Sequence, residues 1–359
     1  MQDKLTSHSF RIRLEENEER LSRFASRSKY SRGRILEEQP SPIRTEFQRD
    51  RDRILHCKAF RRMKHKTQVF IAPVGDHFVT RLTHTLEVSQ IARTISRALN
   101  LNEDLTEAIG LGHDMGHTPF GHIGEDELGK LSPLGFRHNV QSVRIVEKLE
   151  KNGLGLNLTE EVREGMLNHS KPKGDFMSSD LVKGLGLEAQ VIRISDAIAY
   201  LNHDLGDAFR AGVLDETDLP KDVKEAMGDR HSQRINNMVM DIVKTSSKSL
   251  DENSSMELPT IVMSDAMRNV TNLLREFMFE RVYLPVDSGT EGRTARSIIN
   301  LLYESLDANI DLIPREFLEF GESKEHSIAD YISGMTDGYA IRTAESLSPG
   351  IGQTFMQLN

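Results

Sequence analysis

The sequence is poorest in cysteine, with Cys57 as the single example among 359 residues. Because each disulfide needs two cysteines, one cysteine excludes an internal disulfide and any cluster of thiolate metal ligands within one chain. A metal bound by this chain must therefore have nitrogen and oxygen ligands.

Long apolar runs are also missing. Residues 1–20 are charged from the start and lack the apolar centre of a signal peptide, and no later stretch approaches the roughly 20 apolar residues of a membrane-spanning helix. The sequence therefore predicts a cytoplasmic protein with no membrane partner.

Hydrophobic residues make up 37% of the chain and charged residues 28%, which is typical of a folded globular protein. The net charge of −9 is unevenly spread, since residues 1–66 contain 18 basic and 10 acidic residues and the remainder contains 28 and 45. A basic front end suits a nucleic acid or a phosphorylated small molecule, but it equally suits a solvated helix face. Charge alone does not decide between these.

Helical periodicity dominates the pattern, whereas no convincing alternation typical of a strand is found. In residues 82–99 the apolar positions Leu82, Leu86, Ile91 and Ile95 recur at spacings near three, four and seven. The same reasoning predicts helices near 50–66, 81–100, 102–116, 138–150, 159–168, 187–211, 217–243, 259–282, 293–306 and 324–345. The predicted fold class is all-α.

Breaks between these helices are marked by serine, glycine, proline and charge. We expect loops near residue 40, from residue 170 and from residue 245. At the start of the 102–116 helix, Asn102 suits the N-cap, and Glu103 and Asp104 suit the positive end of the helix dipole.

The stretch "GLGHDMGHTPFGH", residues 110–122, ends that helix with His113 and Asp114 side by side. Neighbours on a helix diverge by about 100°, so they can share a metal only if other helices supply the remaining ligands. His84 and Asp196 interrupt otherwise apolar faces of two other predicted helices. Two histidines and two carboxylates suit Mn²⁺, Fe²⁺, Mg²⁺ or Zn²⁺, although each residue alone is more often structural.

Beyond Gly116 the helix must end, because Pro119 disfavours helical geometry at the residue before it. We therefore expect His117 and His122 to lie on a turn. Either imidazole could donate or accept a proton near neutrality, and Glu125, three residues after His122, could orient it. The alternative is a turn whose histidines only cap helices.

Together these residues resemble the signature of the HD-domain metallophosphohydrolases, in the branch of the dGTP triphosphohydrolase-like proteins. The segments that carry the resemblance are "RTEFQRDRDRILHCKAFRRMKHKTQVF", "RLTHTLEVSQIARTI", "GLGHDMGHTPFGHIGE", "FRHNVQSVRIVE", "LEAQVIRISDAIAYLNHDL" and "DYISGMTDGYA". The resemblance implies an all-helical HD fold and one divalent metal per subunit. It also implies hydrolysis of a deoxynucleoside triphosphate (dNTP) to the deoxynucleoside and inorganic triphosphate.

The resemblance also implies roles for individual residues. The metal ligands would be His84, His113, Asp114 and Asp196; the catalytic residues would be His122, Glu125 and His117; the substrate-binding residues would be Gln68, Arg81, His138, Tyr200 and Asp204. Ala197 departs from the pattern, since many relatives have a polar or charged residue there, so one contact is in doubt. His169 recurs in relatives, and we assign it a structural role.

The expected organisation is a basic N-terminal segment (1–43), an HD-type dNTPase helical domain (44–345, HD core about 78–205) and a C-terminal tail (346–359). The expected partners are a dNTP substrate, further copies of the same chain and a single-stranded nucleic acid. Two alternatives stay open: an HD phosphohydrolase acting on another nucleotide, and a nucleotide-sensing protein that binds nucleic acid.

Overall fold

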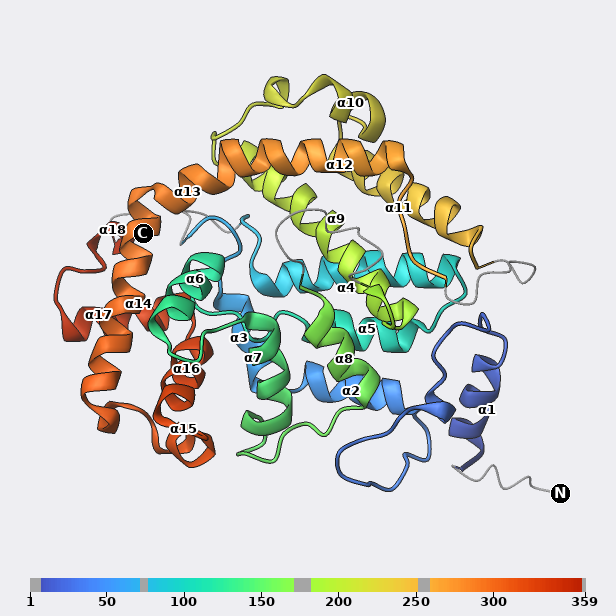
Figure 1. The fold of residues 1–359 in the computed structure, drawn as a ribbon, viewed down its shortest axis with the longest axis horizontal. Coiled ribbons are helices and arrows are strands. Elements are labelled where there is room, and N and C mark those ends of the chain that lie inside the picture. The colour runs from blue at the N-terminus through green and yellow to red at the C-terminus, as the bar shows by residue number, and fades with distance from the viewer. Residues whose placement is uncertain (1–7, 72–76, 171–181, 251–258, 357–359) are drawn as a thin grey trace.

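The computed structural model describes residues 8–71, 77–170, 182–250 and 259–356 (Figure 1). Within these ranges the regular structure is helical, apart from the isolated bridges Arg34–Thr159 and Thr67–Thr80. The predicted all-α fold is confirmed. None of the described helices combines the length and the apolar character needed to cross a bilayer.

The α-helices are α1 (His8–Glu18), α2 (Glu46–Leu55), α3 (Lys58–Arg62), α4 (Arg81–Ala98), α5 (Glu103–Gly112), α6 (Gly121–Leu131), α7 (His138–Arg144), α8 (Glu160–Asn168), α9 (Leu187–Arg210), α10 (Lys221–Met227), α11 (His231–Ser247), α12 (Asp265–Met278), α13 (Leu284–Ser288), α14 (Thr290–Ala308), α15 (Arg315–Phe320), α16 (Lys324–Gly334), α17 (Asp337–Leu347) and α18 (Gln353–Met356). The shorter elements are the 3-10 helices η1 (Ser28–Tyr30), η2 (Met63–His65), η5 (Glu216–Asp218) and η7 (Ile310–Leu312), and the π-helical turns η3 (Ile145–Leu149) and η6 (Phe279–Tyr283).

Four predicted helices are too long: the 102–116 helix ends at Gly112, and three others are divided. The 217–243 helix is split at Gly228, whose φ of +95° lies in the left-handed region that glycine adopts most easily. The 324–345 helix is two helices separated at Met335 and Thr336, and Thr336 caps the second. The 50–66 helix breaks at His56 and Cys57, where the Cys57 sulfur accepts a hydrogen bond from the Phe60 amide.

The predicted start of α5 is confirmed, because the Asn102 side chain accepts a hydrogen bond from the Leu105 amide. The loop near residue 40 is also confirmed. The loop predicted from residue 170 lies largely outside the described residues. The loop predicted from residue 245 begins later, because α11 continues to Ser247, and part of it lies outside the described residues.

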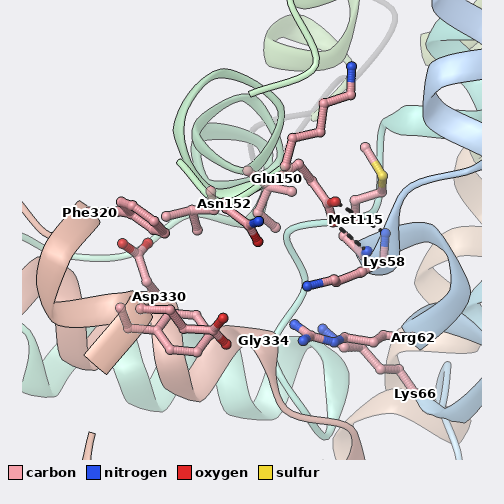
Figure 2. Close-up of a pocket in the computed structure, with 15 residues that line it drawn as sticks. Lys58, Arg62, Lys66, Met115, Glu150, Asn152, Phe320, Asp330 and Gly334 are labelled. Carbon is pink, nitrogen blue, oxygen red and sulfur yellow. Dashed lines mark hydrogen bonds between the residues drawn. The ribbon is translucent and has the colours of Figure 1, made fainter. Parts of the chain in front are cut away.

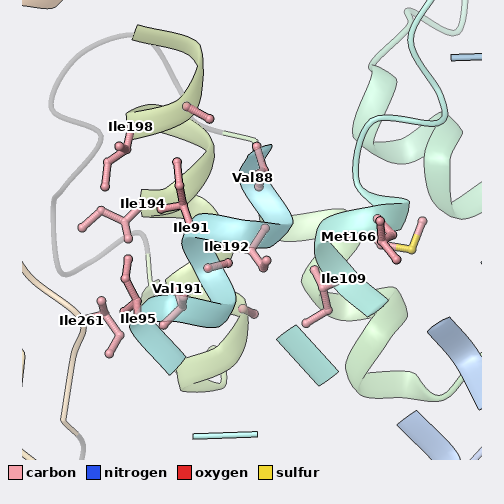
Figure 3. Packing of buried hydrophobic residues seen from close by; sticks show 14 of the residues in the cluster. Val88, Ile91, Ile95, Ile109, Met166, Val191, Ile192, Ile194, Ile198 and Ile261 are labelled. Carbon is pink, nitrogen blue, oxygen red and sulfur yellow. The ribbon is translucent and has the colours of Figure 1, made fainter. Parts of the chain in front are cut away.

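One large core is built around α4, α5 and α9, which pack on one another and on α2 and α8 (Figure 1). Figure 3 shows the contact between α4 and α9, where Ile91 and Ile95 lie beside Val191, Ile194 and Ile198. Apolar burial of this kind is the main stabilising contribution to a helical fold. The core therefore fixes the relative positions of three helices that carry polar residues of interest.

A second apolar cluster joins α14, α16 and α17 to α6, and Phe120, Ile123 and Leu128 contribute to it from the α6 side. Residues 113–125 therefore begin in the first core and end against the second. The histidine-rich segment lies at the seam between the two clusters.

Candidate functional site

Three helices bring the four predicted metal ligands together. His84 lies on α4, Asp196 on α9, and His113 and Asp114 at the end of α5. The Nε2 atom of His84 lies 3.3 Å from Asp196 Oδ1 and 3.5 Å from Asp114 Oδ2. The Nε2 atom of His113 lies 3.5 Å from Asp114 Oδ1 and 4.0 Å from Asp196 Oδ1. The ligand atoms of His84, His113 and Asp114 thus all lie within 4.8 Å of one another, and Asp196 lies beside the two histidines.

The donor atoms fit a divalent cation. The Nδ1–H of His113 donates a 2.7 Å hydrogen bond to the Gly110 carbonyl, which leaves the lone pair on Nε2, and that atom is buried without a hydrogen-bond partner. Burial raises the pKa of Asp114, but the charges of His113, His117 and Arg81 outweigh it and hold the pKa well below its usual range. A neutral imidazole nitrogen and an ionised carboxylate are the forms that bind metals.

A series of polar side chains extends from the Nδ1 atom of His84, on the side of the ring away from Asp114 and Asp196. Its Nδ1 shares a 2.8 Å hydrogen bond with Nε2 of His203, and the Nδ1 of His203 lies 2.9 Å from Asp204 Oδ1. The Tyr283 hydroxyl donates a 2.9 Å hydrogen bond to the other oxygen of Asp204. Such partners orient a ligating imidazole and select its tautomer. Sequence reasoning missed His203, although it lies seven residues after Asp196 and so on the same helix face.

Asp204 was predicted to bind substrate. In the structure Asp204 is buried, and its carboxylate contacts His203, which in turn contacts His84, and accepts a hydrogen bond from Tyr283. A substrate contact for Asp204 stays a prediction. Tyr283, on η6, was also missed, since nothing in the sequence links it to α9.

Glu125 is the centre of a second group of histidines. Its carboxylate accepts hydrogen bonds from the backbone amide of His138 at 2.8 Å and from His138 Nδ1 at 2.7 Å. Its Oε2 lies 3.3 Å from His122 Nδ1 and 3.8 Å from His117 Nδ1. The rings of His117 and His138 stack with centroids 3.9 Å apart. The structure thus brings Glu125 together with the three histidines predicted around it.

One local prediction was wrong, because His122 is on α6 and only His117 is on the turn. Phe120 and Gly121 have φ values of +62° and +58°, and the chain re-enters a helix at Gly121, ahead of His122. Because Phe120 and Gly121 are both left-handed, the chain reverses direction within a shorter turn than Pro119 alone predicted. His122 therefore projects from the first turn of a helix.

Burial and neighbouring charges shift the pKa values of Glu125, His122 and His117 in different directions. Burial raises the pKa of Glu125, but His138 and the hydrogen bond from His122 lower it far more, so this carboxylate is ionised. Burial lowers the pKa of His122, but the hydrogen bond and the negative charge of Glu125 together outweigh it and raise the pKa above its ordinary value, and the side chain is 73% exposed. Burial and the Arg81 charge lower the pKa of His117 well below its ordinary value. Within one cluster, the pKa of His122 is therefore raised and that of His117 is lowered.

His169 belongs to the same region. Its Nδ1–H donates a 2.6 Å hydrogen bond to the Met166 carbonyl, and its Nε2 lies 3.1 Å from Nε2 of His138. The two rings thus meet through these ring nitrogens. His169 faces the site, which goes beyond the structural role expected for it.

Arg81 links the two groups of side chains. It is 1% exposed, and its Nη1 donates a 2.8 Å hydrogen bond to Asp114 Oδ2, while Nε and Nη2 are buried without partners. An unpaired buried guanidinium nitrogen is costly unless a ligand completes it. The Oε1 atom of Gln68 is likewise buried without a partner. Both predicted substrate-binding residues therefore have unused polar atoms in the interior.

A methyl group built on Gly121 would lie 2.8 Å from Arg81 Nη2 and 3.0 Å from the Gln68 carbonyl. Arg81, Gln68 and the turn before α6 are therefore in close contact. Tyr200, one helical turn after Asp196, interacts with Arg275 of α12, and burial raises the pKa of its phenol to about 12. Arg275 is a second residue of α12 and η6 that sequence reasoning missed.

Comparisons with known proteins agree with this geometry. The HD domain model matches residues 81–201, and the phosphohydrolase-associated domain model matches residues 261–346. A deoxyguanosinetriphosphate triphosphohydrolase-like protein of Caldanaerobacter subterraneus subsp. tengcongensis is 53% identical over 323 residues, covering 89% of this chain and 90% of that protein.

Proteins with the same description match from Desulfatibacillum aliphaticivorans, at 47% identity over 89% of this chain and 92% of that protein, and from Clostridium tetani, at 45% over 93% and 94%. A solved structure of a hypothetical protein from Aquifex aeolicus is 18% identical, covers 86% of this chain and 70% of that chain, and has a TM-score of 0.48.

Proposed function

This chain belongs to the family of deoxyguanosinetriphosphate triphosphohydrolase-like HD-domain proteins, and from that premise we propose that it hydrolyses a dNTP to the deoxynucleoside and inorganic triphosphate. The observation that carries the proposal is the convergence of His84, His113, Asp114 and Asp196 beside a buried, incompletely bonded Arg81. A metal site next to an unpaired cation suits a phosphate ester.

His84, His113, Asp114 and Asp196 would hold one divalent cation, with Mn²⁺, Mg²⁺, Fe²⁺ and Zn²⁺ all compatible with nitrogen and oxygen donors. A cation bound there supplies a Lewis acid that neutralises charge on the α-phosphate. The side chains of the protein would bind the phosphates and transfer the proton. Arg81 can donate from Nε and Nη2 to phosphate oxygens while Nη1 stays on Asp114.

The cluster around Glu125 would supply the proton that the leaving oxygen needs. Water attacks the α-phosphorus, the bond between phosphorus and the 5′ oxygen breaks, and that oxygen must gain a proton as it leaves. His122 suits this role because Glu125 raises its pKa and its ring is accessible. His117 and His138, stacked between Asp114 and Glu125, would contact the phosphates.

Gln68, Tyr200 and Arg275 would complete the nucleotide pocket. A site that closes tightly around the 2′ and 3′ positions rejects an added hydroxyl that finds neither space nor a partner. We therefore expect at least one dNTP to be hydrolysed far faster than the matching ribonucleotide. Assembly into homo-oligomers and binding of single-stranded nucleic acid stay predictions.

The test is to incubate the purified protein with each dNTP and each NTP, singly and mixed, with Mn²⁺ or Mg²⁺, and to separate the products. Deoxynucleoside plus triphosphate is the expected pair. Release of pyrophosphate with a monophosphate, or equal turnover of dGTP and GTP, would overturn the proposal in favour of a different HD phosphohydrolase. Salt-sensitive DNA binding without turnover would favour the nucleotide-sensing alternative.

A further inference from the structure

Lys66 is a buried lysine that the proposed chemistry does not use, and burial lowers the pKa of its amino group to about 7. It is 2% exposed and lies between η2 and the bridge residue Thr67. Its Nζ donates to the His117 carbonyl at 2.5 Å and to the Ser333 carbonyl at 2.6 Å. Ser333 lies in the last turn of α16, where free carbonyls attract a cation. One amino group therefore joins the turn that begins at His117 to the C-terminal helices.

Asp337 makes the matching connection from the start of α17. One carboxylate oxygen accepts a 3.1 Å hydrogen bond from the Phe120 amide. The other accepts from the Thr67 amide at 3.0 Å and from the Thr67 hydroxyl at 2.5 Å. Together, Lys66 and Asp337 hold the first carbonyl and the last amide of the turn 117–120.

The turn held in this way carries the reactive groups. It begins with His117, ends at Phe120 in the left-handed conformation, and leads directly into the helix turn that bears His122. The carbonyl of Lys66 also accepts a 3.0 Å hydrogen bond from the Arg81 amide. A shift of residues 66–67 would therefore displace Arg81 and the histidines together.

Packing alone does not close this seam. A cavity of about 50 Å³ lies between α3 and the C-terminal helices and is lined by Lys66, Arg62, Met115 and Gly334 among others. Figure 2 shows the residues around it. Such a volume holds only a few water molecules. The hydrogen bonds of Lys66 and Asp337 thus connect two parts that are incompletely packed beside them.

We propose that Lys66 and Asp337 are positioning residues, which hold the turn 117–120 so that His117 and His122 meet the α-phosphate. The inference rests on the proposed function and deepens it, because it gives the phosphohydrolase-associated helices a part in the reaction without contact to substrate. Misplacement of reacting groups by about 1 Å can cost roughly 100-fold in rate. Loss of either residue should therefore act on turnover.

The experiment compares Lys66→Met and Asp337→Asn with the parent protein, using triphosphate release from the preferred dNTP. We expect kcat to fall by roughly 10- to 100-fold, KM to change by less than about 3-fold, and metal content to stay at the parent value. Lys58→Met is the matched control, since Lys58 lines the same cavity but has an exposed side chain. It should behave as the parent.

A rise in KM with unchanged kcat would overturn the inference by making Lys66 a phosphate-binding residue, and so would unchanged kinetics. If Lys66→Met fails to fold, Thr67→Val removes only the hydroxyl contact with Asp337 at nearly constant volume. It should lower kcat in the same direction by a smaller factor, and parent kcat in a folded Thr67→Val protein would contradict the inference.

A second readout separates this inference from the proposed function, because parent turnover tests only the latter. Histidine side-chain NMR spectra of parent, Lys66→Met and Thr67→Val, loaded with diamagnetic Mg²⁺ or Zn²⁺ and without nucleotide, should show shifts for His117 and His122. The exposed His231 should not shift. Unmoved His117 and His122 resonances would overturn the inference whatever the substrate.

Discussion

The metal-ligand set and the Glu125 cluster lie side by side but are built differently. His84, His113 and Asp196 stand on α4, α5 and α9, whose apolar faces form the main core. His117 lies on a turn and His122 on the helix that follows it, and this segment packs against the second apolar cluster. The first region is rigid through packing, whereas the second depends on hydrogen bonds from distant parts of the chain.

The difference suggests a division of labour between holding charge and moving protons. A metal site needs several donors at fixed distances, which packed helices supply. A proton donor must reach both solvent and substrate, and His122 is the exposed member of its group. The predictions below test whether the two regions can be separated.

The largest effect should come from the metal-ligand set. Asp196→Ala should remove the bound metal and lower triphosphate release by roughly 10⁴-fold or more, since a Lewis acid is worth several kcal/mol in such reactions. Metal content per subunit, activity and helical circular dichroism are the measurements. Asp207→Asn, on the same helix but away from the four ligands, is the control. Full metal occupancy in Asp196→Ala would break the ligand assignment.

The next effect should come from the Glu125 cluster alone. His122→Ala should keep metal and nucleotide binding but lose about 10² to 10⁴ in turnover, as expected for removal of a general acid. Glu125→Gln should resemble it, because the carboxylate that raises the pKa of His122 is gone. Equal loss of metal in His122→Ala would show that the two regions are not separable.

A smaller effect should follow from weakening the support behind His84. His203→Gln should lower metal affinity by roughly 10- to 100-fold, because His203 orients the ligating imidazole. Metal titration into the chelated protein measures this, with His231→Gln on α11 as the control. An unchanged affinity would mean that packing of α4 orients His84 without help from His203.

The smallest effect concerns pH. His122 has a raised pKa and would act in its protonated form under the proposed function, so we expect kcat to decline as pH rises through that pKa, by at most tenfold per unit. The stabilisation from its contact with Glu125 has the same sign, since it is present below the pKa of the unfolded histidine and is lost as pH rises through the folded value. Profiles of kcat from about pH 5 to about pH 9 should lose this alkaline limb in His122→Ala. A limb that persists belongs to another group.

The sequence predicted the first region better than the second, for a physical reason. Helical spacing is local, so the all-α fold and the faces carrying His84 and Asp196 followed from short windows. The break at Gly228 and the helical place of His122 depend on left-handed residues, whose positions a single sequence marks weakly.

Contacts between distant segments could not be predicted from the periodicity and motifs of the sequence. Tyr283 and Arg275 meet α9 only after the chain has packed, and neither lies in a motif that points to the other helix. The role of Asp337 was hidden in the same way, because its partners Thr67 and Phe120 precede it by 270 and 217 residues.

That separation along the chain bears on how the protein is made. A ribosome releases residues 66–67 and 117–120 long before Asp337, so the turn has to wait for the end of synthesis to gain its last hydrogen bonds. The ligand helices can assemble earlier from neighbouring segments. Under the proposed function, a chain that still lacks Asp337 would bind metal before it reached full turnover, and the last rise in activity would come with the C-terminal helices.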